Sequence, residues 1–226
     1  MLLSSRGLNV ATVGVFRLFG RLVFSSSLIC LSCSAKAEQT YSEGEALKWV
    51  STYYNEIFEK VFRLGDSPLD ALGEDTQWAL RVTIRPAFEK ESMLWIRKEY
   101  SGRIHAEAVT AISPVREQMF AIRKASSQGG LEDVAAAIRV RRATGTSENC
   151  PDLESITLGL QMTPLNLPPG DVLYLDPTSY DILYRTHHDE LRFNFVLPES
   201  DEGEPRIAIL SWIDRAIGAI QHCSEE

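Results

Sequence analysis

The sequence lacks several features that would assign a function directly. It has no apolar run of about 20 residues, the length that a helix needs to cross a bilayer. It also lacks a glycine-rich phosphate loop, a dinucleotide-binding fingerprint, a haem-attachment motif and a Gly-x-Ser-x-Gly elbow. Internal repeats and low-complexity tracts are absent too. We therefore expect no cofactor, and no membrane-spanning helix after the leader. The sequence also contains no catalytic motif that identifies an enzyme class.

Positive charge is scarce. The 226 residues contain 23 Lys and Arg against 31 Asp and Glu, which gives a formal net charge of −8 at pH 7. Nucleic acids and anionic membrane surfaces attract proteins mainly through basic residues. The composition therefore argues against a nucleic-acid partner and leaves a small ligand or another protein as the expected partner.

Acidic residues are missing from the first 37 positions, where four basic residues stand. A basic start is followed by the apolar run LVFSSSLICLS at 22–32, and Ala35 and Ala37 precede Glu38. This is the order of a cleaved secretory signal. We expect a signal peptide at 1–37 and a single domain at 38–226, located in a periplasm or outside the cell.

Two other interpretations of the leader stay open. Its long, Ser- and Arg-rich start is compatible with a mitochondrial presequence. Cys33 is compatible with a lipoprotein anchor, although Cys30 stands where an aliphatic residue is expected.

Cysteine is also rare, with four in the chain. Cys30 and Cys33 would leave with the signal peptide, so Cys150 and Cys223 would be the remaining pair. In an oxidising compartment such a pair usually forms a disulfide, and we expect one here. Two free buried thiols, or a bond from Cys223 to a second chain, are the alternatives.

The hydrophobic pattern predicts an α+β fold. Steps of three and four residues predict helices at 42–63, 113–126, 150–165 and 205–222, and a short helix early in 131–145. Alternation predicts strands at 78–86, 92–100, 103–112, 171–177, 179–186 and 190–197, with another late in 131–145. Most strands are adjacent and joined by short loops, so we expect one antiparallel sheet of about five to seven strands, with about four helices packed mainly on one face.

Two adjacent histidines in YRTHHDELRF (184–193) are the first candidate site. Side chains of neighbouring residues in extended backbone point to opposite sides, so His187 and His188 cannot easily share one metal ion. His105 and Glu107 lie two apart on a strand, hence on one face. They resemble half of the zinc deaminase motif, but the Pro-Cys-x-x-Cys that must follow is absent. We interpret 187–189 as a hairpin tip and predict no metal site.

Three arginines at 139–142 form the second candidate. Arg139, Arg141 and Arg142 would bind a phosphate or carboxylate if their guanidinium groups converged. If their strands lay beside this one, four further arginines would add to the patch: Arg81, Arg85, Arg97 and Arg103. The more ordinary interpretation is an exposed charged face.

The function expected from these patterns is binding. We expect an exported ligand- or protein-binding module without catalytic residues. The alternative is a small hydrolase whose site combines His105, Glu107, His187 and His188. An enzyme should place one of these histidines in a cleft beside a carboxylate, whereas a binding module should show an exposed apolar or basic patch on the sheet.

Overall fold

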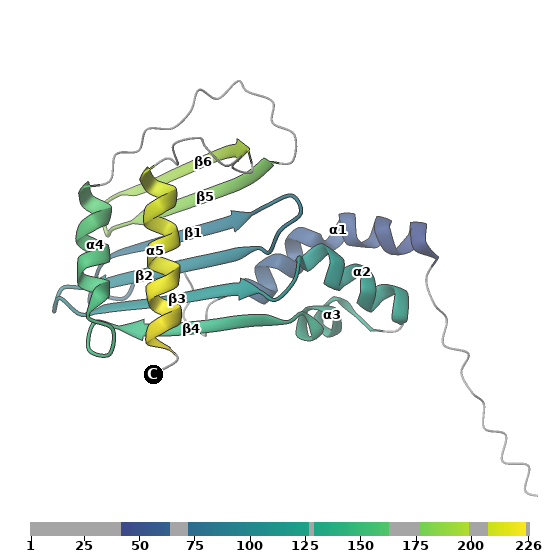
Figure 1. Ribbon diagram of the computed structural model, residues 1–226, viewed down its shortest axis with the longest axis horizontal. Helices are drawn as coiled ribbons and strands as arrows, with labels where there is room; N and C mark the ends of the chain where they lie inside the picture. Colours follow the sequence, from purple (N-terminus) through teal and green to yellow (C-terminus); the bar gives the residue numbers. More distant parts are fainter. Residues whose placement is uncertain (1–41, 64–71, 127–128, 163–176, 199–207, 225–226) are drawn as a thin grey trace, which may run out of the picture. The chain divides into compact units, whose positions relative to one another are not determined.

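The computed structural model describes residues 42–63, 72–126, 129–162, 177–198 and 208–224, without the side chains of 161, 162 and 198. These residues form five helices and one six-stranded antiparallel sheet with the strand order β4-β3-β2-β1-β5-β6 (Figure 1). The strands are β1 (Thr76–Arg85), β2 (Ser92–Glu99), β3 (Ile104–Ala111), β4 (Val140–Thr146), β5 (Pro177–Arg185) and β6 (Glu190–Pro198). The helices are α1 (Glu43–Phe62), α2 (Val115–Ala125), α3 (Leu131–Ala137), α4 (Asp152–Met162) and α5 (Ala208–Cys223). The α+β class and the antiparallel sheet are confirmed.

One face of the sheet, which we call face A, is covered by α4 and α5 (Figure 1). Leu80, Ile96 and Ala106 point to this face from three neighbouring strands and are almost fully buried. Trp212 of α5 is 1% exposed, and its indole N–H donates to the Ile156 carbonyl of α4 at 2.7 Å. The two helices therefore form one layer that packs on the sheet.

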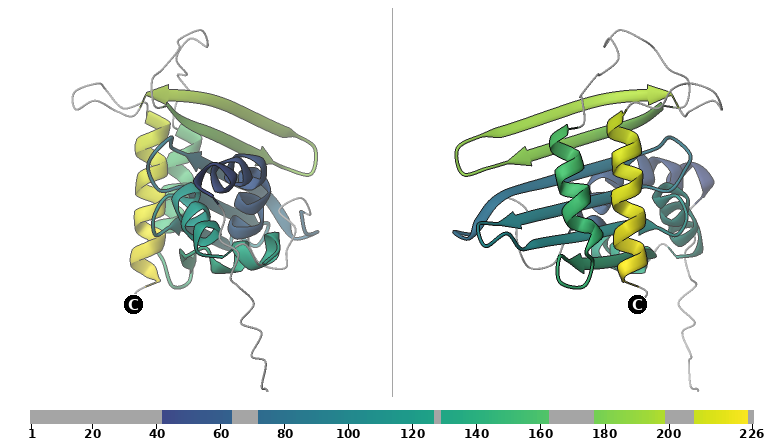
Figure 2. Two further views of the ribbon diagram at one scale, coloured as in Figure 1. Left: turned by 90° about the vertical axis from the view of Figure 1, so that its right-hand side faces the viewer. Right: turned by 60° about the vertical axis from the view of Figure 1, so that its left-hand side comes forward.

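The described helices cover the opposite face, face B, only in part. Helices α1, α2 and α3 gather at the end of the sheet where β4 begins (Figures 1 and 2). They form a second apolar cluster with Met93 and Val109, which are 2% and 0% exposed. The expectation of helices mainly on one face needs correction here, because the helices divide between the two faces. Because helices also lie on face B, strand β1 is buried on both faces near Thr83. Thr83 points to face B and is 3% exposed.

Helix α1 begins as its sequence predicts. Ser42 and Glu45 form a capping box, in which the Ser42 N–H donates to Glu45 Oε2 at 3.0 Å. Hydrogen bonding by Ser42 holds the pKa of the Glu45 carboxyl below its ordinary value. At the other end, Arg142 from β4 donates to the carbonyl of Val61 at 2.6 Å, where the last helix carbonyls have no partner within the helix.

The expected disulfide is confirmed. Cys150, just before α4, is bonded to Cys223 at the end of α5, and their Cα atoms are 5.5 Å apart. The bond joins the two helices that cover face A. Among the described residues, no helix combines the length and apolarity needed to cross a membrane. The expected signal peptide at 1–37 lies outside the described residues, as does the strand expected at 171–177 up to residue 176.

Candidate functional site

The end of face B away from α1, α2 and α3 is polar. Strand registers arrange its side chains in two rows that cross the whole sheet. The outer row contains Thr146, His105, Arg97, Ala79, Arg185 and Glu190. The inner row contains Thr144, Glu107, Trp95, Arg81, Leu183 and Arg192. We call these two rows the polar half-face.

Most charged side chains of the polar half-face form ion pairs. The two residues of each pair are close neighbours in the strand register or in the sequence. Arg192 contacts Asp181 at 2.7 Å, and this carboxylate raises the pKa of the Arg192 guanidinium. Arg185 pairs with Glu190 at 2.9 Å, and Arg97 contacts Glu99 at 3.3 Å.

At the β4 side of the polar half-face, Arg142 pairs with Glu107 at 3.0 Å. Arg142 belongs to the next row toward α1, because it lies opposite Val109 in the register. Glu107, the carboxylate that the hydrolase interpretation requires, is therefore held by a structural arginine.

Arg81 is the exception in the centre of this surface. It is half-buried, it lies between Trp95 and Leu183 in the register, and no ion pair joins it to any described residue. The Nε atoms of Arg81 and Arg97 are both buried, and neither has a hydrogen-bond partner. A guanidinium group stays charged at every physiological pH. Within the described part of the chain, the polar half-face thus contains a cation without a counter-charge.

His105 lies beside a carboxylate, at the edge of this surface. Its Nε2 is 2.8 Å from Glu99 Oε1, and the Ser101 hydroxyl donates to Glu99 Oε2 at 3.0 Å. The Ser101 hydrogen bond, followed by the effects of His105 and Arg97, holds the pKa of Glu99 below its ordinary value against the opposing effect of burial. Nucleophile activation needs the imidazole between the hydroxyl and the carboxylate. Here the carboxylate lies between the other two groups, so the arrangement does not activate Ser101.

The two adjacent histidines lie where β5 turns into β6. The Asp189 N–H donates to Thr186 Oγ1 at 2.9 Å, which closes a hairpin turn and confirms the turn expected there. The ring of His187 stacks on Tyr100 of the β2–β3 turn at 6.2 Å between centroids. His105 and Arg185, which directly precedes the turn, are separated by three strand spacings, about 14 Å. The structure therefore does not bring His105 together with His187 and His188.

The three arginines of the expected anion patch do not share a face. Arg141 pairs with Thr110 and points to face A, whereas Arg142 pairs with Val109 and points to face B. Arg139 precedes β4, and its backbone N–H donates to Gln118. Among the described residues, no three His, Cys, Asp or Glu side chains are grouped closely enough to hold a metal ion.

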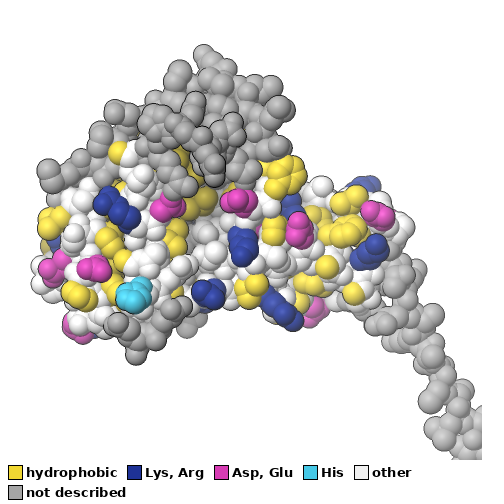
Figure 3. Space-filling model, in the orientation of Figure 1, with side chains coloured by type: hydrophobic (Ala, Val, Ile, Leu, Met, Phe, Trp, Pro, Cys, Tyr) yellow, Lys and Arg dark blue, Asp and Glu magenta, His cyan; other side chains and the backbone are white. Residues whose placement is uncertain are grey.

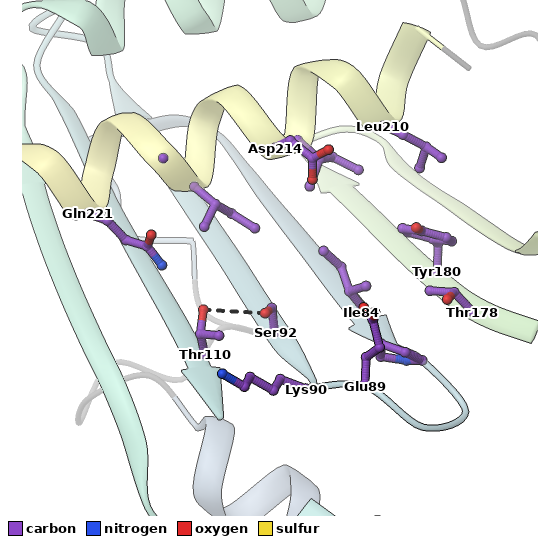
Figure 4. Close-up of a pocket in the computed structure, with 14 residues that line it drawn as sticks. Ile84, Glu89, Lys90, Ser92, Thr110, Thr178, Tyr180, Leu210, Asp214 and Gln221 are labelled. Carbon is purple, nitrogen blue, oxygen red and sulfur yellow. Dashed lines mark hydrogen bonds between the residues drawn. The ribbon is translucent and has the colours of Figure 1, made fainter. Parts of the chain in front are cut away.

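A cavity of about 380 Å³ lies on the other side of the sheet, under α5. Figure 4 shows Lys90 extending toward Thr110, whose hydroxyl contacts that of Ser92 at 3.3 Å. Glu89 and Lys90, which line the rim of this cavity, are exposed. A second cavity of about 370 Å³ lies between α4 and α5. Neither cavity is lined by a histidine, so neither offers an imidazole base for hydrolysis.

Charged groups are distributed differently on the side that carries α4 and α5. Among the described residues visible there, basic and acidic side chains stand singly and interspersed (Figure 3). An exposed surface of this kind is the ordinary condition of a folded protein. It contrasts with the concentration of guanidinium groups on the polar half-face.

The sequence predicts Arg81 and Arg97 only as additions to the arginine patch at 139–142, so it does not identify this surface. The alternation of β1 and β2 indicates which way these arginines point. Their proximity depends on the strand order, and the missing partner of Arg81 depends on where every carboxylate lies. Neither property is present in a local pattern.

Comparison with known proteins adds no family. No protein-family model matches the chain, and no curated protein matches it in sequence.

Proposed function

We propose that this protein is an exported ligand-binding module without catalysis, and that its ligand binds on the polar half-face. The observation that carries the proposal is the incomplete cover of face B: the apolar cluster under α1, α2 and α3 ends at Met93, Trp95 and Val109. Beyond it lie half-buried polar side chains held in place by ion pairs. Such pre-organised side chains on a rigid sheet suit recognition.

Export is supported by the disulfide between Cys150 and Cys223. Disulfides form and persist mainly in periplasmic, extracellular and similar oxidising compartments. The basic, acid-free start of the chain and the Ala35-x-Ala37 site support the same conclusion.

A steric block tests where the ligand binds without assuming its charge. Ala79 lies in the outer row between Arg97 and Arg185 and is 8% exposed. Ala79→Leu adds volume to the floor of the polar half-face and changes no charge. Ala136→Leu makes the same substitution at an exposed position on α3, outside the polar half-face, and serves as the matched control.

The screen uses thermal unfolding with neutral sugars, amino acids, carboxylates and phosphate esters. We expect a member of this panel to raise the Tm of the wild type and of Ala136→Leu but not of Ala79→Leu. Equal shifts in all three proteins would place binding elsewhere. Turnover of p-nitrophenyl acetate or phosphate that is lost in His105→Ala would favour the hydrolase alternative.

A further inference from the structure

We infer that the ligand of the polar half-face is a small molecule with a carboxylate or phosphate group, and that Arg81 binds this group. The inference rests on the proposed function and deepens it. Its starting point is that each of four other arginines near Arg81 on face B has a carboxylate within 3.3 Å: Arg97, Arg142, Arg185 and Arg192. Arg81 has none among the described residues.

The surroundings of Arg81 concentrate positive charge. Arg97 on β2 and Arg185 on β5 both lie opposite Ala79, two residues before Arg81 on β1. Diagonal neighbours of this kind have Cα atoms about 7–8 Å apart. In the register, the small residue Ala79 therefore has three arginine positions as neighbours, Arg81, Arg97 and Arg185.

Hydrogen-bond donors are available at this position. The Nε atoms of Arg81 and Arg97 are buried without an acceptor. A buried donor without a partner has lost its water and gained nothing in return, so it favours an incoming acceptor. Planar guanidinium forks match the two oxygens of a carboxylate or phosphate, which makes an oxyanion the best acceptor.

The same surface favours a small ligand over a polyanion. Glu99, Glu107 and Glu190 lie on or beside the polar half-face, and the chain as a whole has a net charge of −8. A nucleic acid would meet these carboxylates, whereas a small molecule can contact the guanidinium groups alone. Trp95, which is half-buried beside Arg81, offers apolar surface to the remainder of such a molecule.

The test measures binding of three probes by titration calorimetry at constant ionic strength: inorganic phosphate, benzoate and benzamide. Benzamide has nearly the shape of benzoate without its charge. We expect the wild type to bind phosphate or benzoate but not benzamide, and the stronger of the two anions identifies the natural group. Binding of benzamide as tight as that of benzoate would overturn the inference.

Variants assign the binding to Arg81. Arg81→Met should weaken binding of the anion by about tenfold or more, as expected for a lost charged hydrogen bond. Arg81→Lys keeps the charge without the fork and should fall between the two. Arg141→Met removes the same charge from face A, where no ion pair joins Arg141 to a described residue, and should bind as the wild type does.

The stability of these variants separates a binding role from a structural one. Arg81→Met loses no ion pair, so without anion it should unfold at or above the wild-type Tm. Unchanged binding in Arg81→Met, or a loss in Arg141→Met alone, would overturn the inference. If neither anion binds the wild type, the inference fails, while the Ala79→Leu screen still tests the proposed function with uncharged ligands.

Discussion

A buried carboxylate, Glu91, connects three parts of the fold at the scale of single residues. It is 2% exposed, accepts from the Tyr54 hydroxyl at 2.9 Å, and accepts from the backbone N–H of Val115 at 2.8 Å. Tyr54 belongs to α1, and Val115 is the first residue of α2. Glu91 thereby satisfies an unpaired N–H group at a helix N-terminus, where a negative charge is also favourable.

We expect Glu91→Gln to lower the free energy of unfolding by about 1–3 kcal/mol, because a buried charged hydrogen bond is replaced by a weaker one. Glu89→Gln, an exposed position in the same loop, should change it by less than about 0.5 kcal/mol. Urea unfolding of both variants checks this. Equal effects of the two substitutions would show that the contacts of Glu91 contribute no stability.

The hydroxyl of Tyr54 gives stability a dependence on alkaline pH. Burial, and then the nearby charge of Glu91, raise the pKa of Tyr54 well above its ordinary value. Because the pKa of Tyr54 is higher in the folded state, its hydroxyl stabilises the fold fully below about pH 10, the pKa of an unfolded tyrosine. This stabilisation is lost as the pH rises from there toward the folded-state pKa. We expect Tyr54→Phe to lose less stability than the wild type above about pH 10. The measurement is the free energy of unfolding against pH, and the same slope in both proteins would contradict the assignment.

The sequence predicts these residue contacts poorly for a physical reason. Glu89, Lys90 and Glu91 stand together in one short polar loop, and only the positions of α1 and α2 decide which of them is buried. Nothing local distinguishes Glu91. The same holds for Arg81 in the centre of the polar half-face. Its partners would have to come from other strands, so the local sequence does not show whether it has one.

At the scale of elements, periodicity predicts the helices and strands well and their buried faces less well. The capping box and most of the buried stripe of α1 are as expected, but Leu47 is 53% exposed and Ala46 is buried in its place. On α5 the stripe of isoleucines is joined by Trp212, which was not expected in the core. Packing against α4 decides which side of α5 is buried. The apolar pattern of α5 alone does not show this.

Cations that stack on the aromatic residues of α1 could not be predicted either. Arg85 lies over the ring of Phe58 at 4.1 Å, Arg116 over Tyr54 at 4.4 Å, and Arg123 over Trp49 at 3.9 Å. Because the three arginines come from β1 and α2, the contacts join α1 to both elements. They also show that an arginine on a strand or helix can be buried against a ring, contrary to the expectation of an exposed charged face.

The disulfide connects α4 to α5, and its loss should destabilise the layer on face A. For the closed loop, whose two cysteines are 73 positions apart, the chain-entropy model gives a stabilisation on the order of 4 kcal/mol, and measured values are often lower. We expect the double variant Cys150→Ala, Cys223→Ala to unfold at a lower urea concentration than the wild type. A reducing agent should destabilise the wild type and leave the double variant unchanged. A wild type that is indifferent to reduction would contradict the role of the bond.

At the scale of the whole molecule, the sequence predicts the fold class but not the division of helices between the two faces. Short loops and alternating strands indicate an antiparallel sheet, and that sheet is present with six strands. Alternation within β1 suggests an open face, because Arg81, Thr83 and Arg85 are polar. The described helices cover the Arg85 end of β1, where Arg85 lies over Phe58 of α1, and we propose the binding surface at the other end, beside Arg81.

Processing of the leader is a prediction about the whole chain. We expect the protein in its native host to begin near Glu38, because Ala35 and Ala37 form a small-residue cleavage site after the apolar run. Intact-mass analysis of protein isolated from that host measures this. Retention of residues 1–37, or a lipid on Cys33, would contradict it.

The central claim is that a ligand supplies the counter-charge that Arg81 does not find among the described residues. The most direct measurement is a crystal structure of the protein soaked in selenate, an oxyanion whose selenium is located by anomalous scattering. We expect a selenium peak above Ala79 with selenate oxygens within about 3 Å of the Arg81 guanidinium, and its absence in crystals of Arg81→Met. Selenate bound elsewhere, with none at Arg81 in the wild type, would contradict the account.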